Sequence, residues 1–346
     1  MKKILFVGQF PPPVTGEAIA NNIVLESILI RNSVRVVDSS LIVDADDVGV
    51  LRFEKIIKLL SVFLRYAFYL PGCDTVYITP GQTKFGVLRS ALFIVLAKVL
   101  NKKIVSHWHG YGALSIQGVF RFFCRICLSM SSKNIVLTRD ALSKLVSSYR
   151  LPEKKFIEIN NFCDNFDIDV LNRNERLKVI FLGSLMPEKG IEEFLTVCST
   201  LHDVDFYICG AGSKLIREKC ELLQQNNPNV HYLGVVSGHE KYALLKTMDL
   251  FVLQTYYLTE GVPLSMLEAM ACGCAVLTTK HNGIPEVVGE IPVWLDKKSP
   301  ESLMNSLKFF DLNRDVLLEE KKRLYCRSKD FTIQSFRDSV TKLIES

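Results

Sequence analysis

Short apolar runs alternate with longer segments of helical period along the whole chain. The first run, Lys3-Ile-Leu-Phe-Val-Gly8, ends in glycine and is typical of a buried parallel strand. A helical pattern follows at residues 18–29. The same alternation predicts strands at residues 33–39, 74–79, 103–106, 134–138 and 155–161, and helices at residues 51–70, 86–100, 119–130 and 141–149. This order of elements is typical of a parallel sheet with helices on its faces.

A polar, aperiodic stretch at residues 163–176 interrupts the pattern, which then restarts. Single hydrophobic cores seldom grow beyond roughly 250 to 300 residues, so a chain of 346 residues is long enough for two. We therefore expect two Rossmann-like α/β domains, at residues 1–168 and 174–325, followed by a C-terminal helical segment at residues 326–346. The second half has predicted strands at residues 177–182, 205–209, 230–236, 249–254 and 275–279, and helices at residues 191–201 and 333–344.

The composition is that of a globular protein, with 48% hydrophobic and 23% charged residues. Ten cysteines follow no disulfide-like framework, and the N-terminus turns polar too soon for a signal peptide, so we expect a cytoplasmic protein. Cys124-Arg-Ile-Cys127 lacks a second CxxC at zinc-ribbon spacing, and we interpret it as a packing pair. Asp44-Ala-Asp46 matches a short metal-binding pattern that solvated acidic loops also match, so we predict no metal.

The net charge of +5 is concentrated in the N-terminal half. Residues 1–170 carry 21 Lys or Arg against 14 Asp or Glu, whereas residues 171–346 carry 21 against 23. Such asymmetry suggests a polyanionic partner. Because no nucleic-acid module with base-stacking aromatics is present, we expect an anionic membrane surface and no nucleic acid.

Residues 51–70 have a helical period with basic residues on the polar side, namely Arg52, Lys55, Lys58 and Arg65. The charges argue against a transmembrane span, which needs about 20 mostly uncharged residues. Two interpretations stay open. The helix lies on anionic lipid as an interfacial element, or it faces the core and exposes a solvated basic face.

The segment Glu260-Gly-Val-Pro-Leu-Ser-Met-Leu-Glu268 reads as a loop that enters a buried helix. Pro263 suits the first helical position, because its fixed φ is already helical and its missing N–H would have had no partner there. The positive end of this helix would then face an anion such as a phosphate. Glu268 leans back toward the helix start, so two carboxylates are available to one ligand that carries hydroxyls and phosphates.

Two further motifs follow predicted strands, where parallel α/β sheets bind ligands. His107-Trp-His109-Gly110 comes after the strand at residues 103–106, and His107 fits a structural role. Gly183-Ser-Leu-Met-Pro-Glu-Lys189-Gly190 comes after the strand at residues 177–182. There Lys189 is placed to neutralise a leaving diphosphate. Gly16 stands between a proline-rich loop and a helix, as a substrate-facing glycine or as a plain turn glycine.

These motifs, with Phe10-Pro-Pro-Pro-Val-Thr-Gly16, resemble in order and separation those of the retaining glycosyltransferases of family 4, the group 1 enzymes of the GT-B fold. The likeness covers nearly the whole chain, and four motifs at the right separations are a specific signal. It implies two Rossmann-like parallel-sheet domains facing across a cleft, the first binding the acceptor and the second the nucleotide sugar. It also implies that the last helix, at residues 333–344, packs back on the first domain.

The resemblance assigns roles to matching residues. Lys189 and the helix start near Pro263 would stabilise the leaving diphosphate, Glu268 would accept hydrogen bonds from ribose hydroxyls, and Glu260 would hold sugar hydroxyls or the oxocarbenium-like centre. His109 would contact the donor sugar near the reacting carbon. The family usually has arginine where this chain has Ser184, which leaves one cation fewer. Substrate-binding positions would be Gly16, Gly183, Ser184, Lys189, Gly261, Val262, Pro263, Leu264 and Glu268.

The implied activity is transfer of a hexosyl group from a nucleotide diphosphate sugar to a hydroxyl, without a cofactor or an obligatory metal. The expected acceptor is a saccharide or lipid-linked saccharide in capsule, exopolysaccharide or O-antigen synthesis, at the inner face of the cytoplasmic membrane. A nucleotide-sugar epimerase, a phosphorylase and a catalytically inactive nucleotide-sugar-binding protein are the alternatives. Gly210-Ala-Gly212 lacks the third glycine of a nicotinamide site, and Lys189 argues against a glycosidase.

Overall fold

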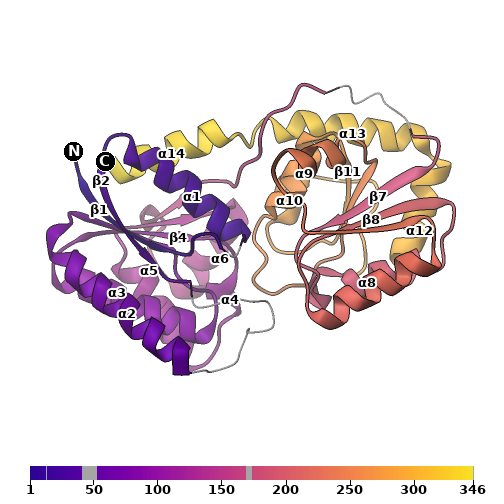
Figure 1. The fold of residues 1–346 in the computed structure, drawn as a ribbon. Coiled ribbons are helices and arrows are strands. Elements are labelled where there is room, and N and C mark those ends of the chain that lie inside the picture. Colours follow the sequence, from indigo (N-terminus) through magenta and orange to yellow (C-terminus); the bar gives the residue numbers. More distant parts are fainter. Residues whose placement is uncertain (13, 41–52, 169–173, 346) are drawn as a thin grey trace. The chain divides into compact units, whose positions relative to one another are not determined.

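The computed structural model describes residues 1–12, 14–40, 53–168 and 174–345 (Figure 1). Backbone contacts divide the chain into two compact units. The first comprises Met1–Asn161, Leu258–Val262 and Gln334–Ser346, and the second comprises Phe162–Tyr257 and Pro263–Ile333. The prediction of two α/β cores is confirmed. The exact domain boundaries predicted from the sequence stay predictions, and residues 169–173 beside the first of them lie outside the described part.

Among the described residues, the first unit contains a six-stranded parallel sheet in the order β2-β1-β3-β4-β5-β6. Its strands are β1 (Lys3–Gly8), β2 (Ser33–Asp38), β3 (Thr75–Ile78), β4 (Lys103–Trp108), β5 (Lys133–Val136) and β6 (Phe156–Glu158). The central β3 is buried along its whole length, which is why it reads as a continuous apolar run. The strand order reverses between β1 and β3, and such switch points are where α/β sheets bind ligands.

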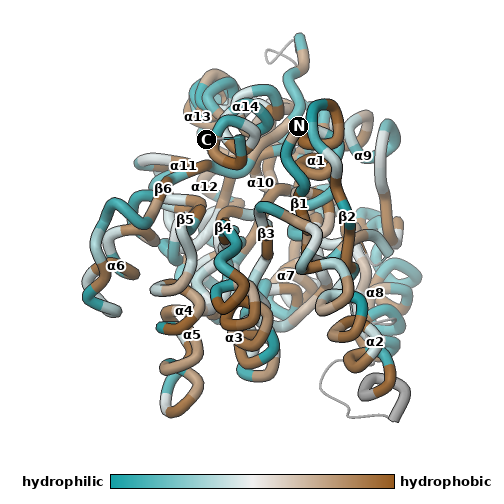
Figure 2. Tube along the Cα trace, turned by 90° about the vertical axis from the view of Figure 1, so that its left-hand side faces the viewer, coloured by the Kyte–Doolittle hydropathy of each residue, from teal (hydrophilic) through white to brown (hydrophobic). Residues whose placement is uncertain are grey.

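The helices of the first unit start on capping residues that the sequence supplies. Thr15, Thr83 and Thr138 each precede a helix and accept a hydrogen bond from the backbone N–H three residues on. The helix α3 is mostly hydrophobic (Figure 2), and it packs on the sheet and on α5. The helices are α1 (Gly16–Leu29), α2 (Phe53–Tyr69), α3 (Lys84–Val99), α4 (Gly112–Ser115), α5 (Val119–Met130), α6 (Arg139–Tyr149) and α14 (Ile333–Glu345).

The last helix, α14, packs on the amino edge of the first sheet. Lys2 Nζ donates to the Ile344 carbonyl at 3.2 Å, and Lys103 Nζ donates to the Leu343 carbonyl at 3.1 Å. Lysines at a helix C-terminus satisfy its last carbonyls and complement its dipole. Further along the helix, the Phe336 ring lies 6.1 Å from the His107 ring, between centroids. Contacts at both ends of this helix therefore hold it in the first unit.

The second unit contains, in its described part, a five-stranded parallel sheet in the order β11-β10-β7-β8-β9. The strand order reverses between β7 and β10, which places a second switch point there. The strands are β7 (Leu177–Leu182), β8 (Val204–Cys209), β9 (Val230–Gly234), β10 (Leu250–Leu253) and β11 (Ala275–Thr278). The helices are α7 (Ile191–Cys198), α8 (Lys214–Asn226), α9 (Gly238–Leu245), α10 (Leu264–Ala271), α11 (Ile284–Val288), α12 (Pro300–Leu312) and α13 (Arg314–Ser328).

A buried ion pair joins α13 to the residue before β10. Lys321 Nζ lies 3.0 Å from Asp249 Oδ1, with side-chain exposures of 8% and 3%. The other oxygen of Asp249 accepts from the Lys178 backbone N–H at 3.0 Å. A buried charge is stable only when it is paired and hydrogen-bonded, and both conditions hold here.

Three predictions from the sequence concern residues outside the candidate site. Cys124 and Cys127 are both buried in the core of the first unit, in agreement with a packing role. No described helix combines the length and the hydrophobicity that crossing a membrane requires. Asp44 and Asp46 lie outside the described residues.

Candidate functional site

The switch point of the second sheet carries the predicted phosphate-binding loop. β7 ends at Leu182 and leads into Gly183 and Ser184, and the neighbouring β10 ends at Leu253. The loops after both strands lie against each other, because the Tyr256 N–H donates to the Glu188 carbonyl at 2.8 Å. The two loops therefore form one surface at the carboxyl edge of the sheet, where Ser184 is exposed.

Lys189 is the last residue of a short 3-10 helix, η4 (Pro187–Lys189), within this surface. The next residue, Gly190, has φ 88°, and a Cβ there would lie 2.8 Å from the Gln254 carbonyl oxygen. Glycine at this position is thus required by both the backbone conformation and the close approach. The Lys189 ammonium lies 5.7 Å from the centroid of the Tyr257 ring, which holds the cation over the loop after β10.

Glu268 lies in α10 and is buried, with 9% of its surface exposed. Lys241 Nζ from α9 donates to Glu268 Oε1 at 2.7 Å, and the Tyr242 hydroxyl reaches the same oxygen at 3.5 Å. Burial raises the pKa of Glu268 above the ordinary carboxyl value, while the Lys241 ammonium lowers it. A carboxylate buried on this helix is therefore costly unless it keeps a cation or hydroxyl donors beside it.

The start of α10 differs by one residue from the prediction. Pro263 has the helical φ of −63°, but its ψ of 123° is extended, so it is the N-cap and the helix begins at Leu264. The expectation that Pro263 occupies the first helical position is corrected accordingly. The backbone turns into the helix only after the proline, because a residue at the N-cap has non-helical dihedral angles. The positive end of α10 still begins at this proline.

The carboxyl end of β4 carries two histidines, the buried His107 within the strand and the half-buried His109 just after it. Tyr77 and His107 form a hydrogen bond of 2.6 Å between the hydroxyl and Nδ1, and the His107 and His109 ring centroids are 4.0 Å apart. Nε2 of each ring is buried and has no hydrogen-bond partner among the described residues. Burial lowers the pKa of His109 to about 3, so its ring is neutral at physiological pH. His109 is therefore suited to form a hydrogen bond with a ligand, and it is not suited to supply a positive charge.

The segment Leu258–Val262, which carries Glu260, packs within the first unit beside His109. The Tyr111 N–H donates to the Thr259 carbonyl at 3.2 Å, and a Cβ on Gly110 would lie 2.1 Å from that oxygen. Gly110 is therefore needed for the close approach of two backbones. Glu260 itself is buried, with 7% of its surface exposed. The structure thus brings Glu260, Gly261 and Val262 into the same unit as His109.

The remaining predicted positions lie at the edges of these surfaces. Gly16 is the exposed first residue of α1, and Gly183 follows β7 with φ 155°. Lys241 and Tyr242, the partners of Glu268, were not predicted from the sequence. A lysine and a tyrosine on a short helix give no periodic or motif signal, so only the packing of α9 on α10 identifies them. Among the described residues, no group of three or more His, Cys, Asp or Glu side chains is placed to hold a metal ion.

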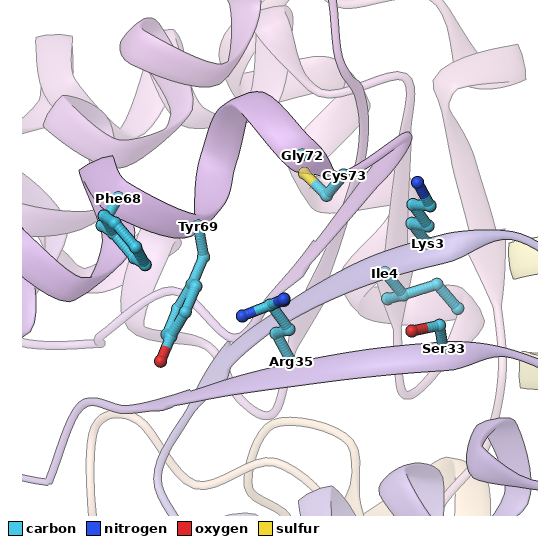
Figure 3. Close-up of a pocket in the computed structure, with 8 residues that line it drawn as sticks. All are labelled: Lys3, Ile4, Ser33, Arg35, Phe68, Tyr69, Gly72 and Cys73. Atoms are coloured by element: carbon cyan, nitrogen blue, oxygen red, sulfur yellow. The ribbon is translucent and has the colours of Figure 1, made fainter.

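A pocket of about 330 Å³ lies elsewhere, at the amino edge of the first sheet (Figure 3). Arg35 of β2 places its guanidinium 4.8 Å from the centroid of the Tyr69 ring at its wall. Because parallel sheets bind ligands at their carboxyl edges, this pocket is not the candidate site. It is lined by Lys3, Ile4, Ser33, Arg35, Phe68, Tyr69, Gly72 and Cys73.

Comparisons with known sequences agree with the motifs of the second unit. Residues 164–329 match the family described as "Glycosyl transferases group 1". The GPI3 subunit of Saccharomyces cerevisiae phosphatidylinositol N-acetylglucosaminyltransferase is 27% identical over 231 residues, covering 64% of this chain and 47% of the relative. A Campylobacter jejuni N,N'-diacetylbacillosaminyl-diphospho-undecaprenol alpha-1,3-N-acetylgalactosaminyltransferase is 30% identical over 185 residues, covering 52% and 43%. The chain thus spans about half the length of these curated relatives.

Solved structures agree with the whole fold. Anabaena HepE, crystallised with UDP and glucose, superposes with a TM-score of 0.74 at 15% identity and full coverage of both chains. The lipopolysaccharide outer core galactosyltransferase WaaB superposes with a TM-score of 0.63 at 13% identity, over 99% of each chain. At such identities the likeness establishes the fold alone. The chain therefore has the two-unit architecture of GT-B glycosyltransferase structures and carries, at residues 164–329, a domain of the glycosyltransferase group 1 type.

Proposed function

We propose that the protein transfers a sugar from a nucleotide diphosphate sugar to a hydroxyl acceptor. One observation carries this proposal: the second switch point combines Lys189, the positive end of α10 and the buried Glu268 in a domain of glycosyltransferase group 1 type. Cations and helix N-termini stabilise a diphosphate as charge develops on it, and a carboxylate accepts hydrogen bonds from ribose hydroxyls. The donor accordingly binds to the second unit and the acceptor to the first.

In this proposal the bound nucleotide and Lys241 both contact the Glu268 carboxylate. Lys241 and Tyr242 both contact Oε1 of the carboxylate. A ribose hydroxyl that donates to Oε2 therefore leaves the ion pair intact. Burial raises the pKa of Glu268, and the Lys241 ammonium opposes that rise, which favours the carboxylate form that accepts a hydrogen bond.

The proposed reaction proceeds with retention at the anomeric carbon, by front-face substitution. The leaving diphosphate departs while the acceptor oxygen bonds to the same face, and the acceptor proton passes to a leaving phosphate oxygen. Neutral His109 and Glu260 hold the sugar during this step. The configuration of the product anomeric carbon, read by NMR before equilibration, tests retention, and an inverted product would contradict it.

Replacing Glu268 by alanine is expected to weaken binding of the preferred nucleoside diphosphate by about 10- to 100-fold. Hydrogen bonds to a charged group contribute about 1.5 to 3 kcal/mol each, and every 1.4 kcal/mol is tenfold in affinity. Isothermal titration calorimetry measures the change. Glu218→Ala, on the surface helix α8, is the matched control and should bind as the native protein does. Equal affinities of the native protein and Glu268→Ala would refute the assigned role.

The acceptor in this proposal is a lipid-linked saccharide in surface polysaccharide synthesis, at the inner face of the cytoplasmic membrane. The names of the Saccharomyces and Campylobacter relatives both specify a lipid, phosphatidylinositol in one and diphospho-undecaprenol in the other. The helix α2 supports this choice, because it has two apolar faces. One face buries Val62 and Tyr66, and the other exposes Ile57, Leu60, Leu64 and Phe68, each with 55–78% of its surface accessible.

Positive charge flanks the exposed apolar face of α2. Lys58 and Arg65 are exposed on the same helix, to one side of that face, whereas Arg52 lies outside the described residues and nothing is inferred from the side chain of Lys55. An apolar row with flanking cations suits insertion into an anionic lipid interface. The core-facing and interfacial interpretations of this helix are compatible, since they concern its two opposite faces.

A double variant, Leu64→Glu with Phe68→Glu, is expected to abolish sedimentation with phosphatidylglycerol vesicles. Two new carboxylates would have to enter the apolar region and would repel the anionic surface. Leu215→Glu with Leu222→Glu on α8 is the matched control, since both leucines are similarly exposed in the second unit. Unchanged sedimentation of the α2 variant, or equal loss in the control, would rule out this surface.

A further inference from the structure

The carboxyl edge of the first sheet contains a polar network that none of the roles above uses. It lies at the switch point between β1 and β3, where β1 ends at Gly8 and Thr79 follows β3. The first turn of α1 adds Glu17, and its second turn adds Asn21. Ligands of open α/β sheets bind at this kind of position.

The network is held together by the Thr79 hydroxyl. This hydroxyl accepts a hydrogen bond from Asn21 Nδ2 at 3.3 Å, and it lies close enough to the Glu17 carboxyl to lower its pKa. Asn21 Nδ2 also donates to the Gln9 carbonyl at 2.9 Å. Asn21 is fully buried and Thr79 is 3% exposed, so both side chains have fixed positions. Glu17 keeps part of its surface exposed.

The end of β1 leaves room for these side chains. A Cβ on Gly8 would lie 2.7 Å from Asn21 Nδ2 and 2.9 Å from Thr79 Oγ1. Both distances are shorter than real Cβ contacts, so glycine at this position lets the network approach the strand end.

Two buried polar atoms in this region have no hydrogen-bond partner among the described residues. These atoms are Oδ1 of Asn21 and Nε of Arg89. Arg89 Nη1 donates to the Ser39 carbonyl at 2.9 Å, and its positive charge faces Glu17 and Asp38. A purely structural network would satisfy its members, because an unpaired buried polar atom costs free energy. An unpaired acceptor, an unpaired donor and a carboxylate together suit a ligand with several hydroxyl groups.

The electrostatics of Glu17 agree with this geometry. Burial raises the pKa of Glu17 to about 7, although the Thr79 hydrogen bond and Arg89 both lower it. Burial raises the pKa of Tyr77 on β3, and the nearby Glu17 carboxyl raises it further. A carboxyl that titrates near neutrality is a common property of functional sites.

We propose that Glu17, Asn21 and Thr79 form a hydroxyl-binding site for the saccharide acceptor, with Glu17 accepting a hydrogen bond from an acceptor hydroxyl. This inference rests on the proposed function, because it assigns the acceptor of the same reaction to a defined place in the first unit. Glu17 is a binding and positioning group in this account, and it takes no proton from the acceptor in the transfer step.

The test is saturation-transfer NMR with three probes, the methyl glycosides of glucose, galactose and N-acetylglucosamine. The native protein should bind at least one of them, and both Glu17→Gln and Thr79→Val should reduce that binding at least tenfold. Two variants are used so that misfolding of one leaves the other to decide the question, and thermal unfolding checks each. Glu26→Gln is the matched control, since Glu26 is an exposed carboxylate of the same helix.

Binding that is unchanged in Glu17→Gln and Thr79→Val, or lost equally in Glu26→Gln, would overturn the proposal. The absence of binding by all three glycosides to the native protein would also overturn it. Nucleoside diphosphate binding is measured on the same samples. If nucleotide binds and the glycosides do not, the hydroxyl site fails while the proposed function stands; if no nucleotide binds, the proposed function itself fails.

Discussion

Replacement of Lys189 by alanine is expected to lower kcat for sugar transfer by about 10²- to 10³-fold, which is the usual cost of removing one preorganised charge-stabilising donor. Lys189 stands at the second switch point, 5.7 Å from the Tyr257 ring, in a loop fixed by the close packing of Gly190 on Gln254. The effect should be large in this chain because the resemblance to family 4 glycosyltransferases implies an arginine at the position that Ser184 occupies. Lys189 therefore carries a larger share of the leaving-group charge.

The measurement is release of nucleoside diphosphate from the preferred nucleotide sugar, followed at saturating donor. Lys214→Ala is the matched control, because Lys214 is an exposed lysine of the same unit that pairs only with Glu218 at 3.7 Å among the ion pairs described. Lys189→Arg should recover part of the rate, since it restores the charge. A Lys189→Ala enzyme with nearly native kcat would remove Lys189 from the mechanism.

Replacement of Glu17 by glutamine is expected to stabilise the protein above neutral pH by on the order of 2 to 3 kcal/mol. Each unit of pKa shift corresponds to about 1.4 kcal/mol, and burial raises the pKa of Glu17 from 4.5 to about 7. The native state then holds this proton more tightly than the unfolded state. The contribution of Glu17 to stability therefore falls as pH rises from 4.5 through 7, and glutamine removes that loss.

Urea unfolding of the native protein and Glu17→Gln at a series of pH values measures the difference. It should be near zero at pH 4 and grow up to pH 8. Glu26→Gln, an exposed carboxylate of α1, should show no such trend. A difference for Glu17→Gln that is independent of pH would mean that the carboxyl titrates normally. A carboxyl whose raised pKa lowers the stability of the protein is typical of groups that are retained for function.

The two parallel sheets were predictable because buried parallel strands read as apolar runs. β3 and β10 are buried along their whole length, so their signal is strong. The loops that carry His109 and Lys189 could be located for the same reason, since each follows such a strand. The helix start at Pro263 was off by one residue, because the fixed φ of proline suits both the N-cap and the first helical position.

The partners of the site residues could not be predicted. Lys241 reaches Glu268 only because α9 packs on α10, and no periodicity in the sequence reports that packing. The network of Glu17 with Thr79 joins residues 62 positions apart through the neighbouring positions of β1 and β3. The grouping of Leu258–Val262 with the first unit likewise depends on contacts between distant strand ends. Motifs indicate which residues along the chain have a functional role, whereas the order of the strands in the sheet determines which of these residues lie close together.

The central claim is that the second unit binds a nucleotide diphosphate sugar. Thermal unfolding of the native protein in the presence of UDP, GDP, ADP, dTDP, CMP, their sugars and NAD tests it most directly. A ligand at 100 times its dissociation constant adds about 2.7 kcal/mol of stability. We expect a clear rise in Tm with one nucleoside diphosphate and its sugar. No rise with any nucleotide, or a rise with NAD alone, would contradict the account.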